Sequence, residues 1–514
     1  MLRTIIVILF AGISLNGYTG DTLSVSFVNQ KTYEYYISAQ WDDLINLGKL
    51  AEQNSINFFY LKLRLGTAYF NKQRYRVAAK YFEKALIDNA NYDYALEMLY
   101  YCYLYTNDKI NLKKLMSRMD SSVLEKLKSQ NKPALNQVYI QGGLVPSINQ
   151  YGTNYNTSYA MEQLELENQK FASAGMSFFL NRRLQIGVGY TTIVTGSSYR
   201  QLINSEEVAL QIKPKQFQYY LKGTVGFGRC FEFTAAAHLI KVNTTLAGIY
   251  AVNDDIETIT NYAYDTLINA VPVHVNVEDK TFNFQHRAIE SFNYSKNLND
   301  YSVYAGLKYK RSYFDLTLSG VYSSLSSGKQ YQGGLGITLY PFANLNTYSQ
   351  TNIDYIDRNY NYNDLQSNNL VVSQLVGQKL YPFLWIEASY NRGNKKDFVS
   401  MQGVVVNNSS FQITDNLGVN LVIPIKNMSF TLSYNYQWRE SVVSSYNREN
   451  TGTYKMNGEM TYTSSWRDTW NGPMRFSTEV IPYSKQTESI EYVKTEETKR
   501  INNHLIMGGL QWKF

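Results

Sequence analysis

Residues that support covalent or metal chemistry are scarce in this 514-residue chain. It has 2 cysteines, Cys102 and Cys230, and 4 histidines, none with a histidine or cysteine at metal-ligand spacing. The G-x-S-x-G, H-E-x-x-H and P-loop motifs are missing as well. We therefore predict no metal, no cofactor and no enzymatic activity. The candidate for a catalytic residue is His238. It has the same parity along its strand as Glu232 and Thr234, so its side chain is expected to point to the inside of the predicted sheet.

Charge and long apolar runs are also scarce. Charged residues make up 18% of the chain, below the ~25% usual for soluble domains, and the net charge of +7 includes no dense run of lysine and arginine. We therefore expect no nucleic-acid partner. Residues 4–15 are apolar, after a positive start and before a small polar stretch. This layout predicts a signal peptide at residues 1–20, and it leaves a β-barrel as the only way for the exported chain to span a membrane.

Tyrosine, in contrast, is abundant, with 46 residues, and aromatic residues reach 15%. After residue 133 they alternate with polar residues, most clearly at residues 216–227, 301–310, 314–322 and 428–438. A soluble sandwich would alternate too, but its strands are usually about 5–6 residues long. Segments of ~10–12 residues favour strands that tilt across a bilayer. The mean hydropathy of -0.34 agrees with this, because only alternate residues of a barrel meet lipid.

Short and long connections alternate between these segments. Short turns are expected at residues 181–183, 228–229, 311–312, 340–344, 379–383 and 426–427. Long polar connections are expected at residues 149–170, 195–213, 252–267, 392–411, 440–454 and 484–501. This arrangement is typical of an outer-membrane barrel with its long loops outside, and we count about 16–18 strands in residues 133–514. The inward-facing candidates, unless they are merely solvated by lumen water, are Lys222, Lys308, Asp315, Glu387, Arg475 and Glu479.

The chain ends on an alternating strand whose apolar face carries Ile506, Leu510, Trp512 and Phe514. It resembles the closing strand of bacterial outer-membrane barrels. The resemblance implies that this strand pairs with the first barrel strand and that the barrel-assembly machinery reads these four residues. An ordinary C-terminal strand of a soluble sheet is the alternative.

Residues 21–132 have a helical period instead. Leu65, Gly66, Tyr69, Ala78 and Phe82 match the tetratricopeptide pattern W-x2-L-G-x2-Y, A-x3-F, although Lys and Ala replace its Trp and its final Pro. The segment resembles an array of about three such repeats, enough to bury a core. The resemblance implies a groove for a periplasmic protein or polymer. Its lining would be Tyr60, Leu63, Thr67, Phe70, Tyr94, Glu97, Tyr101 and Leu104, unless these residues pack against the next helix.

The predicted order is therefore a signal peptide, helical repeats and a transmembrane antiparallel barrel, an α+β multidomain chain. It resembles in architecture the outer-membrane subunits that export cellulose and poly-N-acetylglucosamine. That resemblance implies an outer-membrane channel for a polymer, with the repeats in the periplasm. The alternative is a non-conducting anchor in the outer-membrane lipid, whose repeats scaffold a periplasmic complex. An open lumen would favour the channel, and a plugged lumen would favour the anchor.

Overall fold

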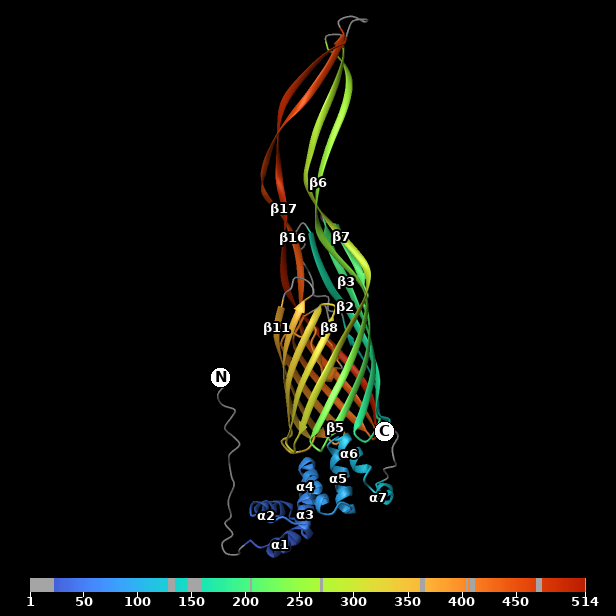
Figure 1. The fold of residues 1–514 in the computed structure, drawn as a ribbon, viewed down its shortest axis with the longest axis vertical. Coiled ribbons are helices and arrows are strands. Elements are labelled where there is room, and N and C mark those ends of the chain that lie inside the picture. Colours follow the sequence, from blue (N-terminus) through green and yellow to red (C-terminus); the bar gives the residue numbers. More distant parts are fainter. Residues whose placement is uncertain are drawn as a thin grey trace.

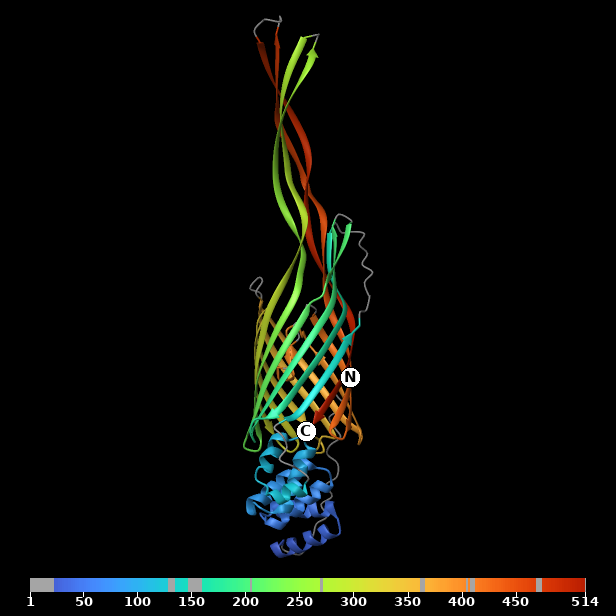
Figure 2. The same ribbon diagram turned by 90° about the vertical axis from the view of Figure 1, so that its right-hand side faces the viewer.

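The computed structural model describes residues 23–127, 135–146, 160–203, 206–268, 271–360, 366–403, 405–406, 412–467 and 474–513. A helical domain lies against one end of a β-barrel, and two long hairpins leave the other end (Figures 1 and 2). The predicted signal peptide, the boundary at residue 132 and Phe514 fall outside the described residues.

The helical domain contains 7 helices among the described residues, and the first six pack as consecutive neighbours. Side-chain oxygens cap two of them: Ser24 accepts from the Phe27 N–H at 3.1 Å, and Asp108 accepts from the Asn111 N–H at 3.3 Å. The helices are α1 (Val25–Ile37), α2 (Trp41–Gln53), α3 (Phe59–Asn71), α4 (Tyr75–Asp88), α5 (Asp93–Tyr105), α6 (Lys109–Met116) and α7 (Ser121–Lys126).

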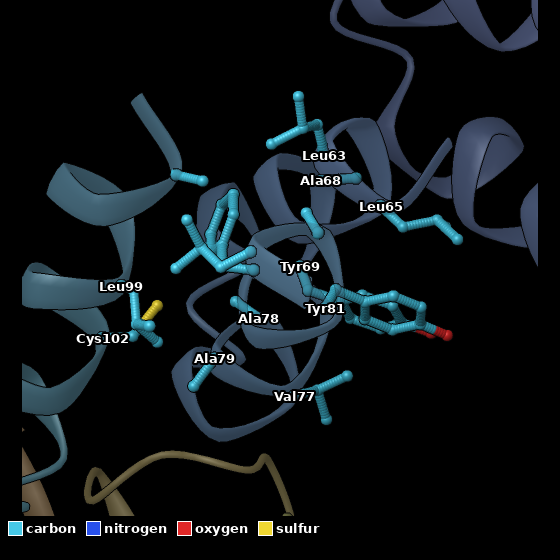
Figure 3. Packing of buried hydrophobic residues seen from close by; sticks show 14 of the residues in the cluster. Leu63, Leu65, Ala68, Tyr69, Val77, Ala78, Ala79, Tyr81, Leu99 and Cys102 are labelled. Atoms are coloured by element: carbon cyan, nitrogen blue, oxygen red, sulfur yellow. The ribbon is translucent and has the colours of Figure 1, made fainter. Parts of the chain in front are cut away.

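The residues that match the repeat pattern form the core between α3, α4 and α5 (Figure 3). Leu65, Ala78 and Phe82 are fully buried. Gly66 allows a close approach of α3 and α4, because a Cβ built there would lie 2.7 Å from Cε1 of Phe82. The sequence therefore placed this core correctly.

The barrel has 14 antiparallel strands among the described residues and closes by pairing β17 with β1. Fewer strands are present than the sequence suggested. The strands of the barrel are β1 (Leu135–Val145), β2 (Ala160–Phe179), β3 (Leu184–Ile203), β5 (Lys215–Phe227), β6 (Phe231–Ile268), β7 (Val271–Lys310), β8 (Phe314–Leu325), β9 (Gly328–Leu339), β10 (Thr347–Tyr360), β11 (Gln366–Tyr381), β12 (Leu384–Arg392), β15 (Gln412–Ile425), β16 (Met428–Arg467) and β17 (Met474–Lys513).

The predicted number of strands was too high because four strands are very long. β6 and β7 run for 38 and 40 residues, and β16 and β17 for 40 residues each. The connections predicted at residues 252–267, 440–454 and 484–501 are strand within these two hairpins, which extend beyond the barrel and pair with each other at Thr461–Ser465 and His274–Glu278 (Figure 1). A further strand, β4 (Glu206–Ile212), pairs with the outer half of β3.

All six predicted short turns are confirmed, and they lie at the barrel end next to the helical domain (Figure 2). Polarity across the barrel wall is the reverse of a soluble sheet. On β9 the inward Gln330 and Gln332 are 2% and 7% exposed, whereas the outward Tyr331 and Leu335 are 54% and 65% exposed. Other strands present an outward apolar residue in the same way, including Ile140, Leu221, Leu239, Val303, Leu318, Ile353, Leu370, Leu417, Leu432 and Ile506.

Candidate functional site

A cavity of about 600 Å³ lies inside the barrel near its helical end. Polar and aromatic side chains on β7 to β12 and on β15 to β17 contribute most of its lining, including Tyr304, Tyr348 and Trp385. Asn107, from the turn between α5 and α6, borders it on one side. Residues 398–400 and Gln402, from the connection after β12, border it on another side. The space, here called the lumen cavity, is thus bounded by the barrel wall and by two elements that are not barrel strands.

The connection after β12 folds back into the lumen. Residues 393–403 and 405–406, here called the lumen loop, contain the short strands β13 (Val399–Ser400) and β14 (Val405–Val406). Gly393 starts the reversal at a φ of 123°, which favours glycine, and a Cβ there would lie 2.2 Å from the Leu370 carbonyl oxygen. Phe398 then packs in a buried cluster with Ile356 and Val371.

Inward side chains of strands far from β12 around the wall hold the lumen loop. On β9, the Gln332 side chain donates to the Val399 carbonyl at 2.9 Å and accepts from its N–H at 3.2 Å. On β5, Tyr220 donates to the Gln402 carbonyl at 2.9 Å. On β6, His238 Nδ1 lies 2.9 Å from the Gly403 carbonyl oxygen. The loop therefore crosses the lumen, and His238, considered above for catalysis, faces inward and contacts this loop.

The buried guanidinium of Arg358 fixes the start of the loop. Its Nε donates to Gln330 at 3.1 Å, and its Nη2 donates to the carbonyls of Asn394 and Lys396. The Gln330 amide donates to the Asp397 carbonyl at 3.0 Å. An arginine that satisfies backbone carbonyls in this way stabilises one loop conformation.

On the other side of the lumen cavity, the helical domain is docked onto the turn end of the barrel through Arg76 of α4. Its guanidinium forms an ion pair with Asp315, donates to the carbonyls of Arg311 and Ser312, and lies 4.0 Å from the Tyr340 ring centroid. Tyr340 also donates to Asp315 at 3.1 Å. The Arg76 and Asp315 side chains are only 12% and 7% exposed. We call Arg76, Asp315 and Tyr340 the latch.

A second contact joins α6 to the barrel. Lys310 forms ion pairs with Asp108 at 2.9 Å and with Glu232 at 2.7 Å. Asn111 donates to the Arg229 carbonyl at 3.0 Å, and Lys114 donates to the Gly228 carbonyl at 2.9 Å. Ile110 is 4% exposed and lies against Gly226, so apolar packing accompanies the charges.

Burial at this interface changes the titration of two helical groups. The pKa of Glu83 is raised, because the effect of burial is larger than the opposing effects. The hydrogen bond from Tyr103 and the positive charge of Arg229, 3.4 Å away, both lower this pKa. Burial also lowers the pKa of Lys109 to about 8, and the positive charges of Lys513 and Lys222 lower it further.

Four of the six predicted lumen residues face inward near the lumen cavity. Lys308 and Glu387 line it, the Lys222 ammonium donates to Gln402 at 3.3 Å, and Asp315 belongs to the latch.

The prediction that Arg475 and Glu479 face the lumen was wrong. The register pairs them with Trp466 and Tyr462 near the tip of the β16–β17 hairpin, far outside the barrel (Figure 1). Parity along a strand defines which face a residue lies on, but it does not show where the strand leaves the barrel.

The predicted groove residues do not form one open surface. Leu63 and Thr67 are buried, so for these two residues the packing alternative holds. The Thr67 hydroxyl lies 2.9 Å from the Tyr94 hydroxyl, and Glu97 pairs with Lys126 at 2.6 Å. Tyr60 and Leu104 are exposed, while Phe70 and Tyr101 each lie 6.1 Å, between ring centroids, from Tyr105.

The closing strand lies as the sequence suggested. Residues 506–513 pair with β1 on one side, and residues 506–512 pair with β16 on the other. Ile506 and Trp512 are about half exposed on the outer face, and Leu510 lies between them at the same parity.

Sequence reasoning missed the lumen loop and the latch. The apolar residues at 398–406 could have indicated the lumen loop, because a loop exposed to water outside the barrel is expected to be polar. The Arg76–Asp315 pair had no local signal, since the two residues lie 239 positions apart. In the described ranges, no helix is long and apolar enough to cross a bilayer. The same ranges contain no group of three His, Cys, Asp or Glu side chains placed to hold a metal ion.

No protein-family model and no curated protein matches this chain. Solved structures that align with this chain include a deltaS2 mutant of the monoaromatic hydrocarbon channel TodX, at 8% identity and a TM-score of 0.38, covering 78% of this chain and 94% of that one. The Pseudomonas putida toluene transporter TodX has 9% identity and a TM-score of 0.36, covering 77% and 93%. The Ralstonia pickettii toluene transporter TbuX has 8% identity and a TM-score of 0.29, covering 74% and 90%.

Proposed function

We propose that this protein is a gated channel of the bacterial outer membrane without enzymatic activity. The observation that carries the membrane location is the reversed polarity of the barrel wall, with Leu335 exposed outside and Gln332 buried inside. Lipid makes such a wall favourable, and water does not. The docked helices then lie on the periplasmic side, next to the short turns, and the long hairpins lie outside the cell.

The lumen loop and the helical domain are the proposed gates. Each is held by hydrogen bonds and ion pairs to the wall rather than by strand pairing, so each can be released while the barrel stays closed on itself. The lumen cavity between them has the size of a small-molecule site. This supports a small solute as the cargo in place of a continuous polymer.

Two expectations from the sequence remain part of this proposal. The consecutive helix pairs α1–α2, α3–α4 and α5–α6 act as tetratricopeptide-type units, whose exposed Tyr60 and Leu104 are available to a periplasmic protein partner. The barrel-assembly machinery reads the end of the chain through Ile506, Leu510, Trp512 and Phe514.

A second function, a non-conducting anchor, is favoured by one observation. The lumen loop and the docked helices both obstruct the lumen, and the hairpins outside and the helices inside could each hold a partner.

Single-channel conductance separates the two. In planar bilayers we expect the mature chain to be mostly closed and the Arg76→Ala variant to open in discrete steps. Arg74→Ala is the matched control, because Arg74 borders the same interface but its side chain forms no hydrogen bond or ion pair with the barrel in the described part of the chain. A folded Arg76→Ala variant that never conducts, even with the lumen loop loosened by Arg358→Ala, would support the anchor and reject the channel.

A further inference from the structure

Four lysines around the lumen cavity have no acidic partner in the part of the chain that the structure describes. Within the described ranges, Lys109, Lys222, Lys308 and Lys513 form no ion pair, whereas the neighbouring Lys310 has two. An ammonium group has three N–H donors. The Lys109 and Lys222 ammonium groups each use one of them, on a neutral amide oxygen, and Lys308 and Lys513 use none on the described chain.

Contacts place these lysines along one arc of the wall. Lys308 on β7 and Lys513 on β17 line the lumen cavity. Lys222 on β5 donates to Gln402, which also lines it. Lys109 enters from α6 and donates at 3.0 Å to Gln137, the residue directly opposite Lys513 in the β1–β17 ladder. The arc runs from β17 through β1 and β5 to β7, at the end of the lumen that the helices cover.

The carboxylates of the lumen cavity lie on the other arc, where they accept hydrogen bonds from neutral side chains. Asp354 on β10 accepts from Gln332 at 3.0 Å. Glu387 on β12 accepts from Tyr348 and, at 3.1 Å, from Asn420. In the described ranges they form no ion pair with the lysines, so positive and negative charges lie on separate arcs of the wall, and a bound anion would meet positive charge on the lysine arc.

We propose that the lumen cavity binds a small anionic solute, bearing a carboxylate or a phosphate, at Lys308 and Lys513, with Lys109 and Lys222 adding attraction at its edge. Clustered like charges in a partly desolvated space repel one another, and a bound anion removes that cost. Burial is the main cause of the lowered pKa of Lys109, and the positive charges of Lys513 and Lys222 lower it further, which places the three ammonium groups near one another. Amides of the lining, such as Gln350 and Gln511, can bind the uncharged part. This inference assigns a solute to the proposed channel and therefore rests on the proposed function.

The direct test is binding to the full chain in detergent, by equilibrium dialysis of labelled succinate and, separately, inorganic phosphate. We expect binding of at least one probe, weakened more than tenfold in Lys308→Gln/Lys513→Gln. Lys329→Gln is the matched control, because Lys329 is exposed on the outer face of β9. Heat-dependent mobility on gels verifies that each barrel is folded. Preference for succinate or for phosphate identifies the anionic group. Absence of binding by both, or equal binding in the double variant, overturns the proposal.

Reversal potentials separate this inference from the channel itself. Under a KCl gradient, Arg76→Ala should be anion-selective, and adding Lys308→Gln/Lys513→Gln should lower that selectivity. An Arg76→Ala variant that conducts but prefers cations refutes the anion site and keeps the channel. A variant that binds succinate but never conducts refutes the channel and keeps the anion site.

Discussion

Loss of the latch should strongly weaken the docking of the helical domain on the barrel. Arg76→Ala removes an ion pair whose side chains are 12% and 7% exposed, two backbone acceptors and the stacking on Tyr340. Truncating one partner of a buried pair leaves the other charge unpaired and costs ~3–5 kcal/mol. At about 1.4 kcal/mol per tenfold, the undocked fraction should rise by at least about 100-fold.

Thiol labelling can measure that change. Ile110 packs against the barrel at Gly226 and is 4% exposed, so a cysteine at 110 reacts only when the domain undocks. With Cys230→Ser as the background, the labelling rate of Ile110→Cys is proportional to the undocked fraction. Cys102, fully buried in the helical core, reports unfolding of the domain itself.

We expect Arg76→Ala to accelerate labelling at position 110 by about 100-fold or more, from the cost given above, and to leave Cys102 unreactive. Arg74→Ala should change neither rate. In a double-mutant cycle with Asp315→Asn, the two costs should not add, because both variants break the same ion pair. Equal rates at position 110 with and without Arg76 would show that the latch does not hold the domain.

Three further results are expected. Leu335→Arg, at a 65% exposed site, should weaken folding into lipid vesicles by ~2–4 kcal/mol in urea titrations, more than Leu335→Ala does, whereas an unchanged midpoint would mean that this face meets water. Gly66→Ala should lower the thermal midpoint of the helical domain, since crowding of Phe82 costs ~1–3 kcal/mol against ~1 kcal/mol of helix propensity, and the sign should reverse in a Phe82→Leu background. The pKa of Lys109 is lowered to about 8, so the folded state loses this proton before the unfolded state does, and stability should rise with pH from about 8 towards the unfolded value. Lys109→Met should remove that rise in denaturant titrations, and an identical pH profile would contradict the assignment.

Local periodicity was sufficient for much of this fold. Alternation located β5, β8 and the barrel part of β16, and turn residues located all six short turns, because both signals depend on neighbours in sequence. The repeat pattern located the contact between Gly66 and Phe82. Parity also directed Lys222, Lys308 and Glu387 into the lumen.

Features that depend on distant contacts were not predictable in this way. Polar segments within β6, β16 and β17 looked like loops, and the alternation beyond them looked like additional barrel strands, so the predicted strand count was too high and Arg475 and Glu479 were placed inside. The lumen loop looked like an outer connection until its contacts with β5, β6 and β9 were known. That the four lysines have no acidic partner among the described residues is likewise visible only in three dimensions.

The two long hairpins have a mechanical consequence. About 30 residues of β7 precede its pairing with β8, which gives a reach of about 100 Å beyond the barrel. Both legs of each hairpin continue as covalent chain into barrel strands, so a pull on the tip loads four backbones in tension and does not unzip the ladders. The tips are also tied by the pairing between β16 and β7, which spreads an off-axis load over both hairpins. A pull from outside should therefore draw the barrel out of its bilayer before the two hairpins come apart.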